Sequence, residues 1–402
     1  MNAFGTFFKF LKFFLICFLV IIFLIIAFNI TACENKEKVI KIGNQSVFSG
    51  DDKFYGLDQT ISLELAASEL SPVKIGGFEY KIDIINKDDE GNSEKAFLVA
   101  QEFVEERVVA VVGSTFNGTT KASLPVYSEY NIPIITPSAQ GEDIGNSFNN
   151  FYRMIINNGQ KIENISKFIT DNIKPSKLIL IDNNEEYGVK LIDYLIEIFK
   201  SQKFEFHKRY SVSYNENEYK ILAENLLIDE PDYIFFCGDY NSLALLITKV
   251  RELGLNCGFI TEELCMNDGI LSIADKSYLE GLIAIVSTPP ELARYSENKK
   301  TIEFWRKYKD YLNKIEDKEI VFELTDTGPG PFAPYSYDAF YIIIEAMKKA
   351  NSTSIEDFSE MLKKTSFDGV TGKIEFNSNG DRLNPLSTIF IIKNGDWVRY
   401  NQ

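Results

Sequence analysis

The sequence predicts an α/β protein built from two doubly wound, Rossmann-like lobes that are joined by a hinge of several strands. The chain has 402 residues, of which 45% are hydrophobic, and this is enough for two ordinary domains with separate cores. Short apolar runs rich in Val and Ile alternate with helix-length segments, as is typical of parallel sheets. The alternation is interrupted by a crossing segment near residues 151–156 and then resumes, and two series of similar length indicate two sheets.

The first series of elements extends to residue 135. Leu57, Ile61 and Leu65 recur at the i, i+4, i+8 spacing of one helix face, which predicts a helix over 55–70. The apolar runs 108–112 and 132–135 flank another segment of helix length, which is the pattern of a βαβ unit. With strands at 39–47 and 80–85 and a helix at 93–106, these segments predict a parallel half of four strands.

The second series repeats this alternation after residue 156. We expect helices at 159–172, 185–201, 218–227 and 241–253, and strands at 177–181, 204–210, 232–237, 258–260 and 282–286. Later helices at 302–311 and 337–350, and strands at 367–376 and 387–393, form no third series and must be shared between the lobes. We therefore expect residues 39–155 and 288–366 in an N-terminal lobe, and residues 156–287 and 367–402 in a C-terminal lobe.

Two loops of the first series carry short polar side chains where a strand ends. Residues 113–118 open the helix that follows the strand 108–112, and residues 136–141 follow the strand 132–135. Ligands bind beyond the carboxyl ends of parallel strands, and the N–H groups at a helix N-terminus attract anions. The two loops are therefore a candidate site for a small anion or zwitterion, with a plain helix cap at Asn117 as the alternative.

The first 33 residues have the composition of an export signal. Lys9 and Lys12 precede an apolar run over residues 13–30, and the small residues that follow end at Cys33. The motif at 30–33 resembles a bacterial lipobox, in which the cysteine becomes the lipidated first residue of the mature protein. The alternative is an uncleaved membrane anchor, since about 18 apolar residues can just span a bilayer. Both readings place the rest of the chain outside the cytoplasm and tethered to a membrane.

Composition and residue counts argue against several functions. A formal net charge of −16 argues against nucleic-acid binding. The sequence contains no metal-ligand spacing and no nucleotide-binding glycine motif, so we expect no metal and no cofactor. The single histidine, His207, argues against a Ser–His–Asp hydrolase. Beyond the leader, Cys237, Cys257 and Cys265 allow either a Cys257–Cys265 disulfide or free, partly buried thiols.

Short patches along the chain resemble the type I periplasmic solute-binding proteins, specifically the leucine/isoleucine/valine-binding group. They include ITPSA at 135–139 and GVTGKIEF at 369–376, and others lie at 39–43, 48–50, 55–56, 88–92, 111–113, 187–188 and 337–339. The order and spacing of these patches carry the resemblance, which covers the chain from Val39 to Trp397. The resemblance implies two lobes that close on an amino acid.

The resemblance also implies which first-lobe residues hold the ligand. Ser138 and Ala139 match positions whose backbone N–H groups meet the ligand carboxylate. Asn117 and Gln140 stand where the family often has a serine and a threonine, and both can still form hydrogen bonds.

Further ligand contacts are implied for the second lobe and the side-chain pocket. Glu263 matches an acid that binds the ligand ammonium, with a solvated acidic loop as the alternative. Tyr187 matches an aromatic residue of the second lobe, and Asp239 or its neighbour lies in a loop that faces the cleft. Tyr55 and Phe332 match positions that contact the ligand side chain.

The sequence therefore predicts a lipid-anchored, extracytoplasmic substrate-binding protein that delivers an amino acid or a similar small solute to an ABC permease. It would act by hinge closure and without catalysis. One alternative keeps the fold and makes the chain a ligand sensor for a membrane receptor. Another, from a different class, is an extracytoplasmic hydrolase, which would require a nucleophile and a base in the cleft.

Overall fold

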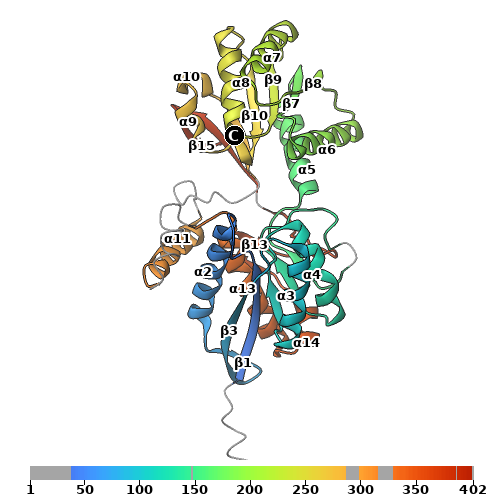
Figure 1. The fold of residues 1–402 in the computed structure, drawn as a ribbon, viewed down its shortest axis with the longest axis vertical. Coiled ribbons are helices and arrows are strands. Elements are labelled where there is room, and N and C mark those ends of the chain that lie inside the picture. Colours follow the sequence, from blue (N-terminus) through green and yellow to red (C-terminus); the bar gives the residue numbers. More distant parts are fainter. Residues whose placement is uncertain (1–37, 146–147, 287–297, 316–328, 386, 401–402) are drawn as a thin grey trace, which may run out of the picture.

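The computed structural model describes residues 38–145, 148–286, 298–315, 329–385 and 387–400. The chain forms two lobes, one above the other in Figure 1, and each lobe is built around its own sheet. The first sheet has six strands in the order β2-β3-β1-β4-β5-β6, and the second has seven in the order β15-β14-β11-β10-β9-β7-β8. Two mainly parallel sheets with covering helices confirm the predicted fold class.

The first lobe holds the N-terminal sheet and the helices that pack on it. Five of its strands run parallel, and the edge strand β2 is antiparallel to β3. The strands are β1 (Lys38–Ser46), β2 (Val73–Ile75), β3 (Phe78–Asp88), β4 (Ala110–Val112), β5 (Ile134–Thr136) and β6 (Phe151–Arg153). The helices are α2 (Lys53–Leu70), α3 (Ser93–Glu105), α4 (Asn117–Glu129), α11 (Lys299–Leu312), α13 (Ala333–Ala350) and α14 (Ile355–Leu362).

Both faces of the first sheet are buried, because alternate strand residues point to opposite sides. Val112 and Ile135 belong to a core that includes residues of α2, α11 and α13. Val111 and Ile134 belong to a second core, formed with α3 and α4. The continuous apolar runs of these strands follow from this two-sided burial.

The second lobe repeats this plan with two antiparallel strands added at one edge. β7 to β11 run parallel, whereas β14 and β15 pair antiparallel next to β11. The strands are β7 (Leu178–Asp182), β8 (Lys208–Ser211), β9 (Tyr233–Cys237), β10 (Gly258–Glu262), β11 (Ile283–Val286), β14 (Thr388–Lys393) and β15 (Asp396–Arg399). The helices are α5 (Asn158–Lys167), η1 (Phe168–Ile173), α6 (Glu186–Gln202), α7 (Glu216–Asp229), α8 (Tyr240–Glu252), η2 (Glu263–Cys265), α9 (Ile270–Ile273) and α10 (Lys276–Leu279).

The segment 367–376, which we expected as one strand of the second lobe, packs in the first. It forms two short antiparallel strands, β12 (Phe367–Gly369) and β13 (Gly372–Ile374), and Ile374 lies in the core with α13. The physical reason is the buried carboxylate of Asp338, which accepts the N–H groups of Val370 at 2.9 Å and Thr371 at 2.8 Å. The chain therefore returns to the second lobe only after this hairpin.

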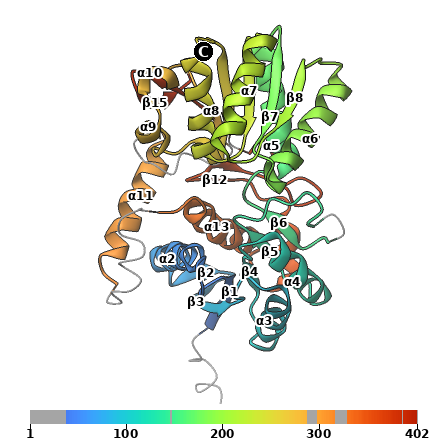
Figure 2. The same ribbon diagram turned by 45° about the horizontal axis from the view of Figure 1, so that its top comes forward.

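The order of the elements takes the chain between the lobes three times: after β6, between β11 and α11, and between β13 and β14. Figure 1 shows described segments that run between the two lobes, and Figure 2 shows the lobes close together when the molecule is turned. The first passage starts at β6, where part of the expected crossing segment forms a strand parallel to β5. Arg153 in β6 donates from Nε to Asp381 of the third passage at 2.9 Å, and Arg382 donates to the backbone oxygen of Met154 at 3.2 Å. The buried guanidinium groups of Arg153 and Arg382 thus connect the first and third passages by hydrogen bonds.

The export signal and Cys33 lie outside the described residues. Within the described ranges, no helix combines the length and apolar character needed to cross a bilayer. Cys237, Cys257 and Cys265 are buried free thiols, so the disulfide alternative is not realised. His207 lies on the surface next to Asp229, with a separation of 3.8 Å between Nε2 and Oδ1.

Candidate functional site

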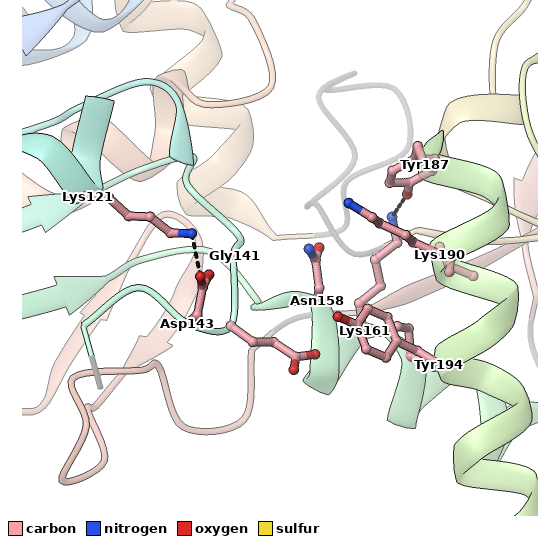
Figure 3. A pocket seen from close by; sticks show the side chains of 11 residues that line it. Lys121, Gly141, Asp143, Asn158, Lys161, Tyr187, Lys190 and Tyr194 are labelled. Atoms are coloured by element: carbon pink, nitrogen blue, oxygen red, sulfur yellow. Dashed lines mark hydrogen bonds and ion pairs between the residues drawn. The ribbon is translucent and has the colours of Figure 1, made fainter. Parts of the chain in front are cut away.

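A cavity of about 470 Å³ lies between the two lobes (Figure 3). The first lobe contributes Lys121, Gly141, Glu142 and Asp143, the last of which is ion-paired with Lys121. The second lobe contributes residues of α5 and α6: Asn158, Lys161, Ile162, Tyr187, Lys190, Leu191 and Tyr194. Because both lobes line it, the size of this cavity depends on how far the lobes close.

The second-lobe side of the site is organised around Lys161. A capping box at Asn157 and Gln160 begins α5, and Lys161 follows in the first turn. Its Nζ donates to the Tyr187 hydroxyl at 2.5 Å, to Oε1 of Glu263 at 2.8 Å and to Oε2 of Glu262 at 3.1 Å. The two acids come from the carboxyl end of β10 and from η2, so the sheet itself positions them. We call these four residues the lysine cluster.

Burial and charge oppose each other in the lysine cluster. The side chains of Lys161 and Glu262 are 1% and 0% exposed, and that of Glu263 is 19% exposed. Burial lowers the pKa of Lys161, but the charges of Glu263 and Glu262 outweigh burial and hold the pKa well above its ordinary value. Burial raises the pKa of Glu262 in spite of the nearby Lys161. The Oε1 atom of Glu262 is buried and has no hydrogen-bond partner among the described residues.

The two polar loops of the first lobe, residues 113–118 and 136–141, lie against each other. The Oγ of Ser138 donates to the backbone oxygen of Thr115 at 2.6 Å, and Oδ1 of Asn117 accepts the N–H of Gly141 at 3.0 Å. Gly113 begins the first loop with φ of 139°, and a Cβ there would lie 2.1 Å from the backbone oxygen of Gln45. A glycine is therefore needed for the loop to pass so close to β1.

The amide donors of the second loop already have an internal acceptor. The N–H groups of Ser138 and Ala139 donate to Oγ1 of Thr136 at 3.3 Å and 3.0 Å. The backbone oxygen of Gln140 accepts the N–H of Asn158 at 3.0 Å, which connects this loop to the first turn of α5. A ligand carboxylate at these amides would have to share them with Thr136.

Tyr55 and Phe332, which were predicted to contact the ligand side chain, are neighbours in the first lobe. Their ring centroids lie 5.7 Å apart, and the ring of Phe116 lies 6.4 Å from Tyr55. Phe116 directly precedes Asn117, so this aromatic group adjoins the first ligand loop. Burial, and then the charge of Asp52, raise the pKa of Tyr55, which keeps its hydroxyl protonated.

Asp239 acts as the N-cap of α8. Its Oδ1 accepts the N–H groups of Asn241 and Ser242, both at 3.0 Å, and its Oδ2 accepts the Ser242 hydroxyl at 2.6 Å. Burial raises the pKa of Asp239, but the bonds from Ser242 outweigh burial and lower it. Both carboxylate oxygens of Asp239 therefore accept hydrogen bonds from the first turn of α8.

Eight of the nine predicted residues lie in three groups: the two loops, the aromatic pair, and Tyr187 with Glu263. Asp239 stands apart from them, and of the nine only Tyr187 is among the residues that line the cavity. Sequence reasoning missed Lys161 and Glu262, although Glu262 directly precedes a predicted site residue. It also missed Arg153, whose guanidinium donates to the backbone oxygens of Ala139 at 3.0 Å and Gly141 at 2.9 Å. No periodic or motif signal identifies such residues, because their role depends on partners in other loops.

Comparison with known proteins agrees with the fold of two lobes. The leucine-, isoleucine-, valine-, threonine- and alanine-binding protein of Pseudomonas aeruginosa is 22% identical over 353 residues, which cover 87% of this chain and 89% of that protein. The structure resembles the branched-chain amino acid transporter substrate-binding protein LivJ of Streptococcus pneumoniae, solved with isoleucine. That likeness has a TM-score of 0.64 and 20% identity, and covers 90% of this chain and 99% of that one.

A putative branched-chain amino acid ABC transporter structure from Rhodospirillum rubrum is also similar, with a TM-score of 0.76 and 18% identity. It covers 90% of this chain and 100% of that one. The family model described as periplasmic binding protein matches residues 39–396. That family consists of solute-binding proteins and not of enzymes, so the hydrolase alternative is not supported. With a family match over nearly all of its length and a fold of two lobes around a cavity, the chain belongs to the periplasmic binding protein family.

Proposed function

We propose that this chain is the extracytoplasmic solute-binding component of an ABC importer, and that it binds an amino acid or a related small solute between its lobes. The observation that carries the proposal is the cavity of about 470 Å³, lined by both lobes and by the buried charge of Lys161. Cavities of this size with a few polar groups suit small molecules. The related proteins, named for leucine, isoleucine and valine, support this class of solute.

The proposed mechanism is closure of the lobes on the solute. A ligand that contacts both lobes favours the closed form by its difference in affinity for the two forms. The passages joined by Arg153 and Asp381 would act as the hinge, and the closed form would present the surface that a permease recognises.

We propose that the predicted residues divide between the two ends of the solute. The loops with Asn117, Ser138, Ala139 and Gln140, at the N-terminus of α4, would hold a carboxylate by hydrogen bonds and by the helix dipole. The aromatic rings of Tyr55 and Phe332 would contact its apolar part, and Tyr187, Asp239 and Glu263 would close the site from the second lobe.

A thermal-shift screen of the full chain in detergent tests this proposal. The panel contains the common L-amino acids and small carboxylates, with nucleoside monophosphates as the negative control. A solute at 100 times its Kd stabilises the native state by about 2.7 kcal/mol, which raises Tm by a few degrees. If no amino acid or small carboxylate raises Tm, the proposed solute class is wrong.

We also propose that the chain is attached to the membrane by a lipid on Cys33. The support is the basic start, the apolar run and the small residues that precede this cysteine. Such an anchor would keep the two lobes close to a permease in the same membrane.

A further inference from the structure

The ammonium group of Lys161 is fully used within the protein. An ammonium has three N–H donors. Those of Lys161 have three acceptors, Tyr187, Glu263 and Glu262, at 2.5, 2.8 and 3.1 Å. The Tyr187 hydroxyl in turn donates to Oε2 of Glu262 at 3.1 Å, so the lysine cluster forms a closed network. A buried charge with this many partners is held firmly in place.

The position of this ammonium bears on what the site can bind. Tyr187 and Glu263 are the second-lobe residues that the family resemblance assigns to the ligand, and Nζ of Lys161 is within hydrogen-bond distance of both. A ligand ammonium that approached the same two groups would come close to Nζ and be repelled by it. Figure 3 shows the Lys161 side chain on the cavity wall beside Tyr187.

Moving Lys161 aside would be unfavourable. Its departure would leave Glu262, which is fully buried, without its cationic partner and next to Glu263. Loss of the cationic partner of a buried carboxylate strongly destabilises the folded state. The other lysines of the cavity do not replace it, because Lys121 is paired with Asp143 and Lys190 with Glu186.

We propose that Nζ of Lys161 substitutes for the ammonium of a ligand, so that this chain binds small carboxylates that lack an α-ammonium group in preference to the corresponding amino acids. The carboxylate would still be held by the loops around Asn117 and Ser138, at the N-terminus of α4. This inference rests on the proposed function and narrows its solute class.

The test uses ligand pairs that differ only in the α-ammonium group. Binding of L-leucine and 4-methylpentanoate to the full chain in detergent is measured by titration calorimetry, and likewise L-valine with 3-methylbutanoate and L-phenylalanine with 3-phenylpropanoate. We expect at least one carboxylate to bind 10-fold or more tightly than its amino acid. Lys161→Met should shift that ratio at least 10-fold toward the amino acid, because the ammonium that repels a ligand ammonium near Glu263 is then absent.

Two further variants make the comparison decisive. Lys74→Met removes a lysine that does not line the cavity and whose side chain is 79% exposed, and it should leave the ratio unchanged. If Lys161→Met does not fold, the double variant Lys161→Met/Glu262→Gln removes the unpaired buried charge as well and is measured in its place.

The outcomes separate the inference from the function on which it rests. Tighter binding of the amino acid than of its carboxylate in every pair that binds would overturn the inference and leave the proposed function standing. An unchanged ratio in the Lys161 variants would also overturn it. If neither member of any pair binds the wild type and the wider screen is negative, the proposed function fails together with the inference.

Discussion

At the scale of single residues, the lysine cluster changes the role of Glu263. From the sequence, this acid was expected to bind a ligand ammonium. In the structure its Oε1 accepts a hydrogen bond from Nζ of Lys161 at 2.8 Å. A carboxylate that already has a buried cationic partner contributes to folding as well as to binding. A substitution at Glu263 therefore has two consequences, which can be measured separately.

Glu263→Gln should lower the free energy of unfolding as well as change ligand affinity. The neutral amide can still accept a hydrogen bond from Lys161, but the ion pair is lost, and we expect a loss of about 1–3 kcal/mol. Urea unfolding followed by circular dichroism measures the loss. Glu186→Gln is the matched control: it breaks the exposed pair with Lys190, and little change is expected. Wild-type stability in Glu263→Gln would show that the ion pair does not contribute to folding.

The sequence could predict Glu263 but not Lys161, and the reason is physical. A lysine in the first turn of a helix is expected to be exposed, since lysines are almost never fully buried unless paired. The two acidic partners of Lys161 lie 101 and 102 positions away in the sequence. The burial of Lys161 therefore depends on how α5 packs against the end of β10, and no local pattern encodes that.

At the scale of elements, apolar runs predicted the central strands and amphipathic spacing predicted the long helices. β2 and β15 were missed because they have three and four residues, too few to show a period. The segment 367–376 contains enough apolar residues for one strand. It becomes a hairpin because Gly372 has φ of 84°, which permits a tight turn, and because Asp338 accepts the N–H of Thr371 in that turn. Its place in the first lobe follows from that contact with α13.

A buried acid joins three first-lobe elements and should give the protein a specific pH dependence. Asp58 of α2 accepts the Tyr308 hydroxyl of α11 at 2.7 Å and the N–H of Gly330, just before α13, at 3.0 Å. Burial raises its pKa from 3.8 to about 7, although these hydrogen bonds oppose the rise. Between about pH 4 and pH 7 the folded state keeps a proton that the unfolded state has lost. Asp58 therefore makes its full contribution to the free energy of unfolding below about pH 4. This contribution is lost as the pH rises to about 7.

Asp58→Asn should remove this contribution, because an amide does not titrate. Relative to the wild type, the variant should gain stability between pH 4 and pH 8, by an amount on the order of 3–4 kcal/mol. Urea unfolding at several pH values gives this difference. Asp83→Asn, at an exposed position of β3, is the control and should show no such trend. A constant difference between Asp58→Asn and the wild type across this range would contradict the role assigned to Asp58.

At the scale of the whole molecule, the two lobes and the cavity between them depend on contacts that no single element contains. The alternation of strands and helices predicted two sheets. The hydrogen bonds of Arg153 and Arg382 between the passages that join the lobes could not be predicted, because their partners lie far apart in the sequence. Arg153 donates to the backbone oxygen of Ala139 and to Asp381 of the third passage. One side chain thus contacts both the connection between the lobes and a loop that we propose to hold the solute.

Cys33 should determine how the two lobes are attached to the membrane. A lipid of the type implied by the lipobox is attached through a cysteine sulfur, so Cys33→Ser removes the only atom in the motif that could carry it. We expect the wild type to incorporate a labelled fatty acid and to lose its leader. The variant should lack the label and either leave the membrane fraction or keep the unprocessed mass. Cys17→Ser, within the apolar run, is the matched control and should be labelled like the wild type. Normal labelling of Cys33→Ser would exclude Cys33 as the site of lipid attachment. An unlabelled wild type of full mass would instead identify the leader as an uncleaved anchor, since its apolar run is just long enough to span a bilayer.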